Sequence, residues 1–456
     1  MSQTIVALAT PTGRSGIGVV RLSGNSALEI VGKLVNEGGY SPEPRVAHLK
    51  QLVDPATTET IDEAIVTFFK APHSFTGEDV VEISCHGSPV LLRQVIDICL
   101  AENARLADPG EFSLRALANG RMDLAEAEAI RDLIDAQTVA SARQAIRQLR
   151  GELSQQLQPL KDDLLNVIVT LESALEFVED DLPDVQLEIV KQKLVDIVGR
   201  TRALADTFKA GHLIREGLRV AIVGRPNVGK SSLFNALLGS DRAIVTDIAG
   251  TTRDQIHERF TIGDIPISLI DTAGLRETTD TVESIGVERS KATMADADIV
   301  IVMLDASLPV TADDREILNS VIGVTNLIAH NKIDKLSESE LERSLSAVHY
   351  LSNVVPISAK TGVGLDNLKR AVIEPFSPNE GNSHAGFLVT DVRHHDLLVR
   401  TASELKSSLE NLDQKMSEEI VLIGLHNALR YLGEITGETT TEDMLTRIFS
   451  TFCIGK

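Results

Sequence analysis

Apolar residues change their spacing along this chain, and each change predicts a different kind of element. Within residues 1–118, apolar runs of strand length stand next to amphipathic stretches of helix length. The strand-like runs cover residues 5–9, 19–22, 64–69 and 80–84, and the clearest helical stretch covers residues 89–100. The pattern therefore predicts a small α+β domain at residues 1–118.

From residue 119 to residue 212 the apolar period becomes helical. Apolar residues recur at alternating steps of four and three, first along residues 153–178 and again along residues 190–208. The acidic segment 179–184, which contains Pro183, separates the two stripes. Stripes of this kind pack on each other or on further helices, so the pattern predicts a helical bundle.

Strand-like runs return within residues 213–378, and a helix start follows the first of them at Ser231. The runs cover residues 218–223, 265–270, 326–330 and 354–357. After a linker with Pro and Gly at 375–381, a helical pattern resumes through residue 432. Because residues 379–456 alone would bury only a weak core, we expect them to complete the first helical bundle. The α/β domain at 213–378 is then an insertion between two halves of one helical domain, 119–212 and 379–456.

Composition narrows the class of protein. A length of 456 residues predicts about three domains. The net charge of -22 argues against a broadly basic nucleic-acid surface, so any RNA contact is local or is made through a partner. No apolar run reaches the roughly 18 residues of a membrane span, and no secretory signal is visible. We expect a cytoplasmic protein without a membrane partner.

The segment Gly224-Arg225-Pro226-Asn227-Val228-Gly229-Lys230-Ser231 lies between the first strand-like run of this domain and a helix start. That context predicts a phosphate-binding P-loop. The glycines let backbone N–H groups close around phosphates, and Lys230 supplies a positive charge to the β and γ phosphates. The Ser231 hydroxyl is a candidate Mg²⁺ ligand.

Three further segments follow strand-like runs and predict a guanine nucleotide. Asp271-Thr272-Ala273-Gly274 is a candidate for the magnesium and γ-phosphate side, and Ser358-Ala359-Lys360 fits the last base-contacting loop. In Asn331-Lys332-Ile333-Asp334, the Asp334 carboxylate can accept hydrogen bonds from both N–H groups on the edge of guanine. Adenine lacks that pair of donors, so binding it would leave Asp334 unpaired. The chain is therefore predicted to bind GTP.

Leu275 follows the magnesium-side segment where Ras-like enzymes carry a Gln that orients the attacking water. An apolar side chain cannot hydrogen-bond that water, so another group must. Arg276, Glu277 and Glu283 are the nearby candidates, and spacing alone does not choose among them. Glu283 equally fits an acidic residue in the first turn of a helix that starts near Ser284.

The segment 243–254 lies between the P-loop and Asp271, and one of its threonines is expected to complete the Mg²⁺ shell. With Asn227 in the P-loop and Leu275 after the magnesium-side segment, the domain resembles the translation-factor-related GTPases that a potassium ion can activate. Such an ion would lie beside the phosphates, where an arginine finger otherwise places its charge, and would be held by oxygen ligands.

Motifs outside the α/β domain add a family resemblance. Residues 9–14, 74–79 and 108–113 read Ala-Thr-Pro-Thr-Gly-Arg, Ser-Phe-Thr-Gly-Glu-Asp and Asp-Pro-Gly-Glu-Phe-Ser, and residues 452–456 read Phe-Cys-Ile-Gly-Lys. With these motifs the whole chain resembles the tRNA modification GTPase family MnmE, also called TrmE.

The resemblance implies an N-terminal domain similar to tetrahydrofolate-binding domains, a discontinuous helical domain and an inserted Ras-like P-loop G domain. It implies a homodimer, formed through the N-terminal domain, that works with the flavin-dependent partner MnmG or GidA in a heterotetramer or larger complex. The family hydrolyses GTP while a carboxymethylaminomethyl or aminomethyl-type group is added to C5 of the wobble uridine, position 34, of certain tRNAs. The one-carbon unit would come from 5,10-methylene- or 5-formyl-tetrahydrofolate.

The resemblance also implies roles for individual residues. Potassium would be held by Asn227, Thr246, Ile248 and Thr251, and Mg²⁺ by Ser231 and Thr252. Glu283 would position the attacking water through a further water. Folate would contact Arg21, Glu82, Arg121 and Lys456, with Arg121 standing where some family members carry Lys. The residues expected at GTP are Asn227, Val228, Gly229, Lys230, Ser231, Ser232, Thr246, Asp247, Ile248, Ala249, Gly250, Thr251, Thr252, Asp271, Thr272, Ala273, Gly274, Asn331, Lys332, Asp334, Ser358, Ala359 and Lys360.

Two alternatives stay open at the level of sequence. Cys453 corresponds to a terminal cysteine for which the family suggests a catalytic part, yet no neighbouring His or other base marks it as activated, and a packing role fits equally. The chain is either an enzyme subunit in tRNA modification or a binding switch such as a ribosome-assembly GTPase. The long N-terminal domain and the C-terminal Cys-Ile-Gly-Lys favour the first.

Overall fold

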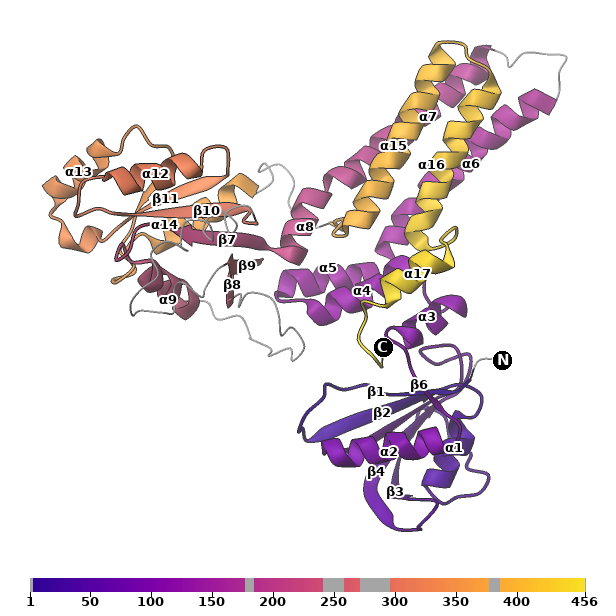
Figure 1. Ribbon diagram of the computed structural model, residues 1–456. Coiled ribbons are helices and arrows are strands. Elements are labelled where there is room, and N and C mark those ends of the chain that lie inside the picture. The colour runs from indigo at the N-terminus through magenta and orange to yellow at the C-terminus, as the bar shows by residue number, and fades with distance from the viewer. Residues whose placement is uncertain (1–2, 177–183, 241–257, 271–295, 377–385, 456) are drawn as a thin grey trace. The chain divides into compact units, whose positions relative to one another are not determined.

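The chain forms two compact units. The computed structural model describes residues 3–176, 184–240, 258–270, 296–376 and 386–455 (Figure 1). One unit comprises Met1–Arg131, Gln148–Leu194 and Ser403–Lys456, and the other comprises Asp132–Arg147 and Val195–Ala402. Long helices α7 (Asp184–Asp206) and α15 (Val392–Asp413) contribute residues to both units. None of the helices in the described ranges is at once long and apolar enough to cross a membrane.

The first unit contains a six-stranded sheet in the order β3-β4-β5-β2-β1-β6. Its strands pair antiparallel except for β1 with β6, which pair parallel. Helices α1 (Ala27–Leu34) and α2 (Pro89–Ala101) add apolar side chains to the core on one face of this sheet. The strands are β1 (Ile5–Leu8), β2 (Ile17–Ser23), β3 (Ala47–Val53), β4 (Thr60–Phe69), β5 (Val80–His86) and β6 (Arg105–Leu106).

Cys85 and Cys99 both lie in this core. Burial raises the pKa of each thiol to about 12, so both side chains are protonated packing groups at neutral pH. Cys99 is fully buried, as expected for a packing side chain.

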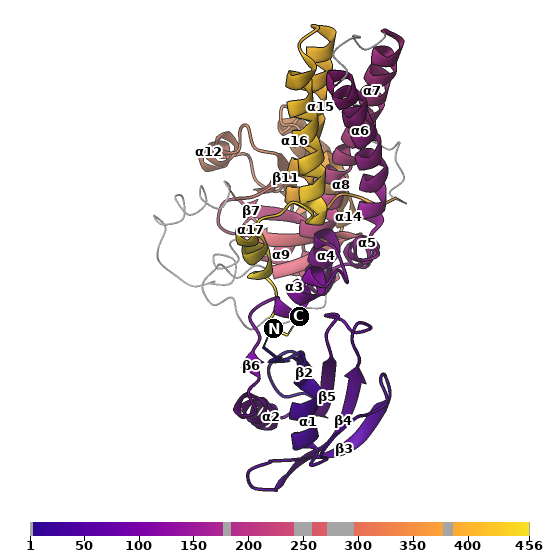
Figure 2. The ribbon, with the colours of Figure 1, turned by 90° about the vertical axis from the view of Figure 1, so that its right-hand side faces the viewer.

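The helical part confirms the first predicted stripe. Leu153, Leu157 and Leu160 are at most 2% exposed on α6 (Glu152–Glu176), as are Leu164, Val167 and Leu171 further along the helix. Helix α6 packs along α16 (Glu418–Thr436), so residues far apart in the sequence form one bundle (Figure 2). The acidic segment expected to separate the two stripes lies almost wholly outside the described residues.

A smaller apolar core brings together helices that lie far apart in the sequence. Helix α17 (Glu442–Phe449) contacts α3 (Glu111–Ala118), and Phe449 and Phe452 pack with residues of α3 and α4 (Leu124–Asp135). Gly110 has no room for a side chain, because a Cβ there would lie 2.6 Å from the carbonyl oxygen of Phe449. The buried members of this core are Leu124, Ala127, Phe449 and Phe452, with Leu114, Leu117, Met122, Leu445 and Ile448 packed against them.

The second unit contains a mainly parallel sheet in the order β12-β11-β10-β7-β9-β8. Only β8 runs antiparallel to its neighbour β9. The strands are β7 (Leu218–Val223), β8 (Glu258–Ile262), β9 (Ile265–Ile270), β10 (Ile299–Asp305), β11 (Asn326–Asn331) and β12 (Val354–Pro356). Apolar clusters cover both sheet faces. The next two strands in the chain, β8 and β9, lie on one side of β7, and the following strand β10 lies on its other side. A ligand crevice is therefore expected at the carboxyl end of β7.

Helices flank this sheet. The predicted helix after the P-loop is present as α9, and all four predicted strands of this domain are present, with β7 and β9 matching their expected bounds. Further helical segments among the described residues of this unit are α5 (Val139–Leu149), α8 (Phe208–Glu216), α12 (Ala312–Ser320), α13 (Glu338–Ala347) and α14 (Leu365–Ile373), with the short 3₁₀ turns η1 (Ile333–Lys335) and η2 (Glu374–Phe376). Helix α9 spans Lys230–Ser240.

A charged cluster in the second unit ties three distant segments. The Arg215 guanidinium on α8 lies 2.9 Å from Asp132 Oδ1 and 2.6 Å from Asp391 Oδ2. Burial opposes ionisation of Asp391, but the electrostatic effects of His394 and Arg215, together with the hydrogen bonds from Arg215 and from Arg393 N, outweigh it and hold the pKa of this carboxyl well below its usual range. The cluster therefore fixes α8, which leads directly into β7, against the segment that precedes α15.

We expect Asp391→Asn to lower the free energy of unfolding by about 3 kcal/mol at pH 7, because it removes one partner of a buried ion cluster. The depressed pKa of Asp391 stabilises the fold above the unfolded-state pKa of about 3.9. That stabilisation is lost as the pH falls further. The gap between the urea unfolding midpoints of variant and parent should therefore stay constant from pH 7 to about pH 5 and narrow progressively from about pH 4 to pH 2. A constant gap across this range would contradict the ionic origin of the effect.

Candidate functional site

The P-loop, residues 224–231, joins the carboxyl end of β7 to α9. Gly224 has φ 153° and Gly229 has φ 107°, backbone angles that favour glycine. A Cβ at Gly229 would lie 2.3 Å from Asn331 Nδ2, so a side chain at this position would collide with the segment that follows β11. The two glycines that predicted the loop are therefore required by its geometry.

Lys230 is held inside this loop by the loop's own backbone. Its ammonium donates to the carbonyl oxygens of Gly224, at 2.6 Å, and Arg225, at 2.9 Å. Burial lowers the pKa of this ammonium. A phosphate group brought next to Lys230 would meet a desolvated cation at the N-terminus of α9, which is the arrangement expected for a phosphate site.

The last residue of β11 and the residue after it are joined to the P-loop by their side chains. Asn331 Nδ2 donates to Val228 O at 2.8 Å, and Lys332 Nζ donates to Asn227 O at 2.6 Å. Asn331 Oδ1 in turn accepts from Ala359 N at 2.9 Å. The structure thus brings together the P-loop and both predicted base-contacting segments at the carboxyl edge of the sheet.

Asp334 is exposed and oriented by one hydroxyl. Ser358 Oγ donates to Asp334 Oδ1 at 2.6 Å, and this hydrogen bond is the largest of the effects that lower the pKa of Asp334. The carboxylate is therefore ionised at neutral pH. An ionised carboxylate next to Ser358, Ala359 and Lys360 can accept hydrogen bonds from the N–H groups of guanine, as expected.

Two acidic side chains that the sequence analysis missed support the P-loop from opposite sides. Asp305 Oδ2, at the end of β10, lies 2.6 Å from Lys332 Nζ. Asp314 Oδ1 lies 2.6 Å from Arg225 Nε and belongs to the capping box that starts α12. The Thr311-x-x-Asp314 spacing indicates a helix start but not the contact with Arg225. The signal for Asp305 was its place at the end of a continuous apolar run.

Several predicted site residues lie outside the described residues. They are Thr246, Asp247, Ile248, Ala249, Gly250, Thr251, Thr252, Asp271, Thr272, Ala273, Gly274, Glu283 and Lys456. Among the described residues, no group of three or more His, Cys, Asp and Glu side chains could hold a metal ion.

A second group of predicted residues gathers on the sheet of the first unit. Arg21 donates to Glu82 Oε1 from Nη2 at 2.7 Å and to Gly455 O from Nη1 at 3.2 Å. The Arg21 guanidinium lies 5.7 Å from the ring centre of Phe75 and 5.8 Å from that of Phe112. Residues from three of the family motifs therefore surround one cation.

Arg121 lies close to the motif at residues 74–79. Its Nε donates to Ser74 O at 3.1 Å, so Arg121 is hydrogen-bonded to the residue next to Phe75.

Cys453 is exposed. Its neighbours are anchored, because Arg131 donates to Thr451 Oγ1 at 2.8 Å and lies over the ring of Phe452.

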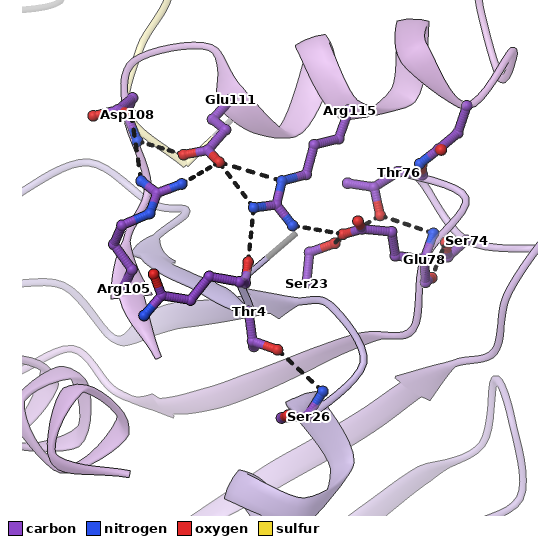
Figure 3. A network of polar contacts seen from close by, with 12 residues as sticks. Thr4, Ser23, Ser26, Ser74, Thr76, Glu78, Arg105, Asp108, Glu111 and Arg115 are labelled. Carbon is purple, nitrogen blue, oxygen red and sulfur yellow. Dashed lines mark hydrogen bonds and ion pairs between the residues drawn. The ribbon is translucent and has the colours of Figure 1, made fainter. Parts of the chain in front are cut away.

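A buried network around Arg115 connects the motif at 74–79 with the motif at 108–113 (Figure 3). Arg115 donates to Glu78 Oε2 at 2.8 Å and to Glu111 Oε1 at 2.9 Å, and Glu111 also pairs with Arg105. Burial opposes ionisation of Glu111, but the hydrogen bonds from Arg105, Asp108 and Arg115 outweigh it and lower the pKa of this carboxyl. The network fixes the loop that carries Phe75 and Ser74 beside Arg21 and Arg121.

Comparisons with known proteins cover the whole chain. A family model for the N-terminus of the GTP-binding protein TrmE matches residues 4–121, and a model for the MnmE helical domain matches residues 124–453. The chain is 44% identical over 459 residues to the tRNA modification GTPase MnmE of Koribacter versatilis, and 44% identical over 457 residues to that of Aquifex aeolicus. Both alignments cover 100% of this chain and of the relative.

A solved structure of Aquifex aeolicus Era bound to GDP and aluminium fluoride is 28% identical to this chain. The match covers 41% of this chain and 66% of Era, with a TM-score of 0.29. Because that score is low, the assignment of the nucleotide domain rests on the strand order, the P-loop geometry and the base-contacting segments of this chain.

We expect Asp334→Asn to weaken GTP binding between tenfold and a hundredfold, about the loss of one hydrogen-bonded charged partner. ATP binding should change little, because adenine does not present the donor pair that Asp334 accepts. Calorimetric titration of both nucleotides measures the difference. Ser358→Ala is the matched control and should weaken GTP binding less, because it removes only the orienting hydroxyl. Equal affinity of the parent protein for ATP and GTP would contradict this assignment of Asp334.

Proposed function

Because this chain belongs to the tRNA modification GTPase MnmE family, we propose that it uses GTP hydrolysis to drive a modification at C5 of the wobble uridine. Family membership makes it a GTP hydrolase that takes part in tRNA modification. The observation that carries the proposal is the junction of the P-loop with the guanine-contacting segments through Asn331 and Lys332. That junction supplies the nucleotide site that the activity needs.

The described residues fit a magnesium-bound guanine nucleotide. The P-loop has glycines where a Cβ would collide with neighbouring groups, and Lys230 is a buried cation next to the start of α9. We propose Ser231 and Thr252 as the Mg²⁺ ligands, and Asn227, Thr246, Ile248 and Thr251 as the potassium ligands. Bound cations would neutralise phosphate charge. The protein itself would contribute the P-loop amides, Lys230 and a water-positioning Glu283.

The first unit is proposed to bind 5,10-methylene- or 5-formyl-tetrahydrofolate in an N-terminal domain similar to tetrahydrofolate-binding domains. A pterin ring presents an N–H pair like that of guanine, and a carboxylate such as Glu82 can accept from it. Arg21, Arg121 and Lys456 would offer positive charge to the carboxylates of the folate tail. The arrangement of Arg21 between Phe75, Phe112 and Glu82 supports this site. Cys453 is proposed to stand near the reacting carbon, with a packing role as its alternative.

We propose the remaining features on the same family basis. The domains would be 1–118, 119–212, 213–378 and 379–456, and the N-terminal domain would form a homodimer. A flavin-dependent MnmG or GidA protein would join in a heterotetramer or larger complex that receives the tRNA in the cytoplasm. The net charge of -22 favours tRNA contacts that are local or shared with this partner.

Cells that lack this chain should lose the aminomethyl-type group on their wobble uridines, and re-supply of the chain should restore it. Mass spectrometry of tRNA nucleosides measures this change. We expect Lys230→Ala to fail to restore the group, because the P-loop loses its cation. Lys406→Ala is the matched control, since that lysine is half-exposed on α15 and paired only along its helix. Unchanged wobble nucleosides in the deleted cells would contradict the proposal and favour a ribosome-assembly switch.

GTP turnover should be about tenfold or more faster in K⁺ than in Na⁺ at equal ionic strength. The reason is that Leu275 cannot hydrogen-bond an attacking water, while Asn227 offers an amide oxygen on the exposed side of the P-loop. Steady-state phosphate release in the two salts measures the ratio.

Glu283→Ala is expected to slow hydrolysis about a hundredfold in either salt with nucleotide affinity unchanged. Equal rates in K⁺ and Na⁺ would contradict the potassium site, and a Glu283→Ala protein at the parent rate would return Glu283 to a helix-end role.

A further inference from the structure

We infer that Asp305 is a positioning residue for the nucleotide site, which acts by holding Lys332 so that Lys332 fixes Asn227 in the P-loop. Asp305 is not part of the P-loop or of either base-contacting segment. Asp305 would thereby raise the affinity of the site for guanine nucleotides. It would also support activation by potassium, an effect that rests on the proposed function.

The register of the sheet places Asp305 next to Lys332. Strands β10 and β11 pair parallel, with Asp305 opposite Asn331, and Ala306 N donates to Asn331 O at 2.8 Å. Lys332 adopts a left-handed backbone conformation with φ 70° directly after β11. Its ammonium then meets two acceptors, Asp305 Oδ2 at 2.6 Å and Asn227 O at 2.6 Å. Lys332 is thus a bridge between the end of β10 and the P-loop.

The two oxygens of Asp305 have separate partners. Oδ2 pairs with Lys332, whereas Oδ1 accepts from Ser307 N at 3.0 Å and from Ser307 Oγ at 2.6 Å. Asp305 is only 7% exposed, and burial opposes its ionisation, yet these hydrogen bonds outweigh burial and lower the pKa of the carboxyl. The group at the end of the bridge is therefore an ionised carboxylate.

Asn227 needs such a bridge because its own backbone is in a disfavoured region. Its φ is 63°, a left-handed conformation that Asn adopts more readily than most other non-glycine residues but still at some cost in free energy, so contacts that hold the turn stabilise it. Lys332 holds the carbonyl of Asn227, and Asn331 holds the next carbonyl, that of Val228. Two consecutive P-loop carbonyls are therefore anchored, and the first depends on a lysine whose second partner is Asp305.

Asp305→Asn separates this role from a general role in the loop. The amide has one oxygen in place of two, so it can accept from Ser307 or from Lys332 but not from both. In either orientation the Lys332 ammonium loses its ionised partner. Ser307→Ala is the matched control, because it removes a hydroxyl contact to Oδ1 and leaves the pair with Lys332 intact. A purely structural role would make both variants less stable without changing cation selectivity.

The measurements are GTP and GDP dissociation constants by calorimetry, kcat and KM in K⁺ and in Na⁺, and Tm for the full-length chain. We expect Asp305→Asn to weaken both nucleotides about tenfold and to move the K⁺ to Na⁺ ratio of kcat towards one. Ser307→Ala is expected to change affinity and ratio by less than about twofold. Unchanged affinity and ratio in Asp305→Asn, or equal losses in both variants, would overturn the inference.

A double variant keeps the test decisive if Asp305→Asn alone fails to fold. Asp305→Asn with Lys332→Met removes both members of the pair and leaves no unpaired buried charge. If Asp305 acts through Lys332, the double variant binds GTP as well as Lys332→Met alone. Weaker binding by the double variant would overturn the inference. A parent protein without potassium preference would contradict the proposed potassium site, while the affinity comparisons would still decide the role of Asp305.

Discussion

Two side chains after one strand hold the nucleotide site together. Asn331 and Lys332 donate to the carbonyls of Val228 and Asn227, and these carbonyls belong to the turn that must face phosphate. Because β7, β10 and β11 are parallel neighbours, their carboxyl ends meet at one edge, where short side chains suffice to join the loops. The same sheet edge therefore positions both the phosphate-binding loop and the base-contacting segments, and the loops are not placed independently of each other.

In the first unit, the buried guanidinium of Arg115 likewise holds together the segments around the candidate folate site. Arg115 pairs with Glu78 from one motif and Glu111 from another (Figure 3). The Arg21 guanidinium lies near the rings of Phe75 and Phe112. Removing charges from water is unfavourable unless each donor and acceptor is satisfied, and Arg115 satisfies this condition with two carboxylates and the Gln3 carbonyl. Such a network is rigid because any displaced member would leave a charge unpaired.

The local pattern of apolar residues was sufficient to predict the strands that precede the nucleotide-binding motifs. The bounds of β7 and β9 follow from apolar runs, and the positions of Asn331 and Asp334 follow from the strand before them. Contacts between distant residues could not be predicted in the same way. The pairs Asp305 with Lys332 and Arg21 with Gly455 depend on register and on chain crossings, and neither leaves a periodic trace in the sequence. The continuous helical pattern through residue 432 also did not reveal that α15 and α16 are separate helices.

The small core shared by α3, α4 and α17 has a consequence for how the chain is made. Leu114 and Leu117 lie in the first third of the chain, while Phe449 and Leu445, which belong to the same core, lie about 330 residues later. Ribosomes add roughly 5–20 residues per second, so the nascent N-terminal segment waits on the order of 15–60 s for its cover. During translation this segment exposes an apolar surface, and its core can close only after residues 445–452 have been synthesised and have left the ribosome.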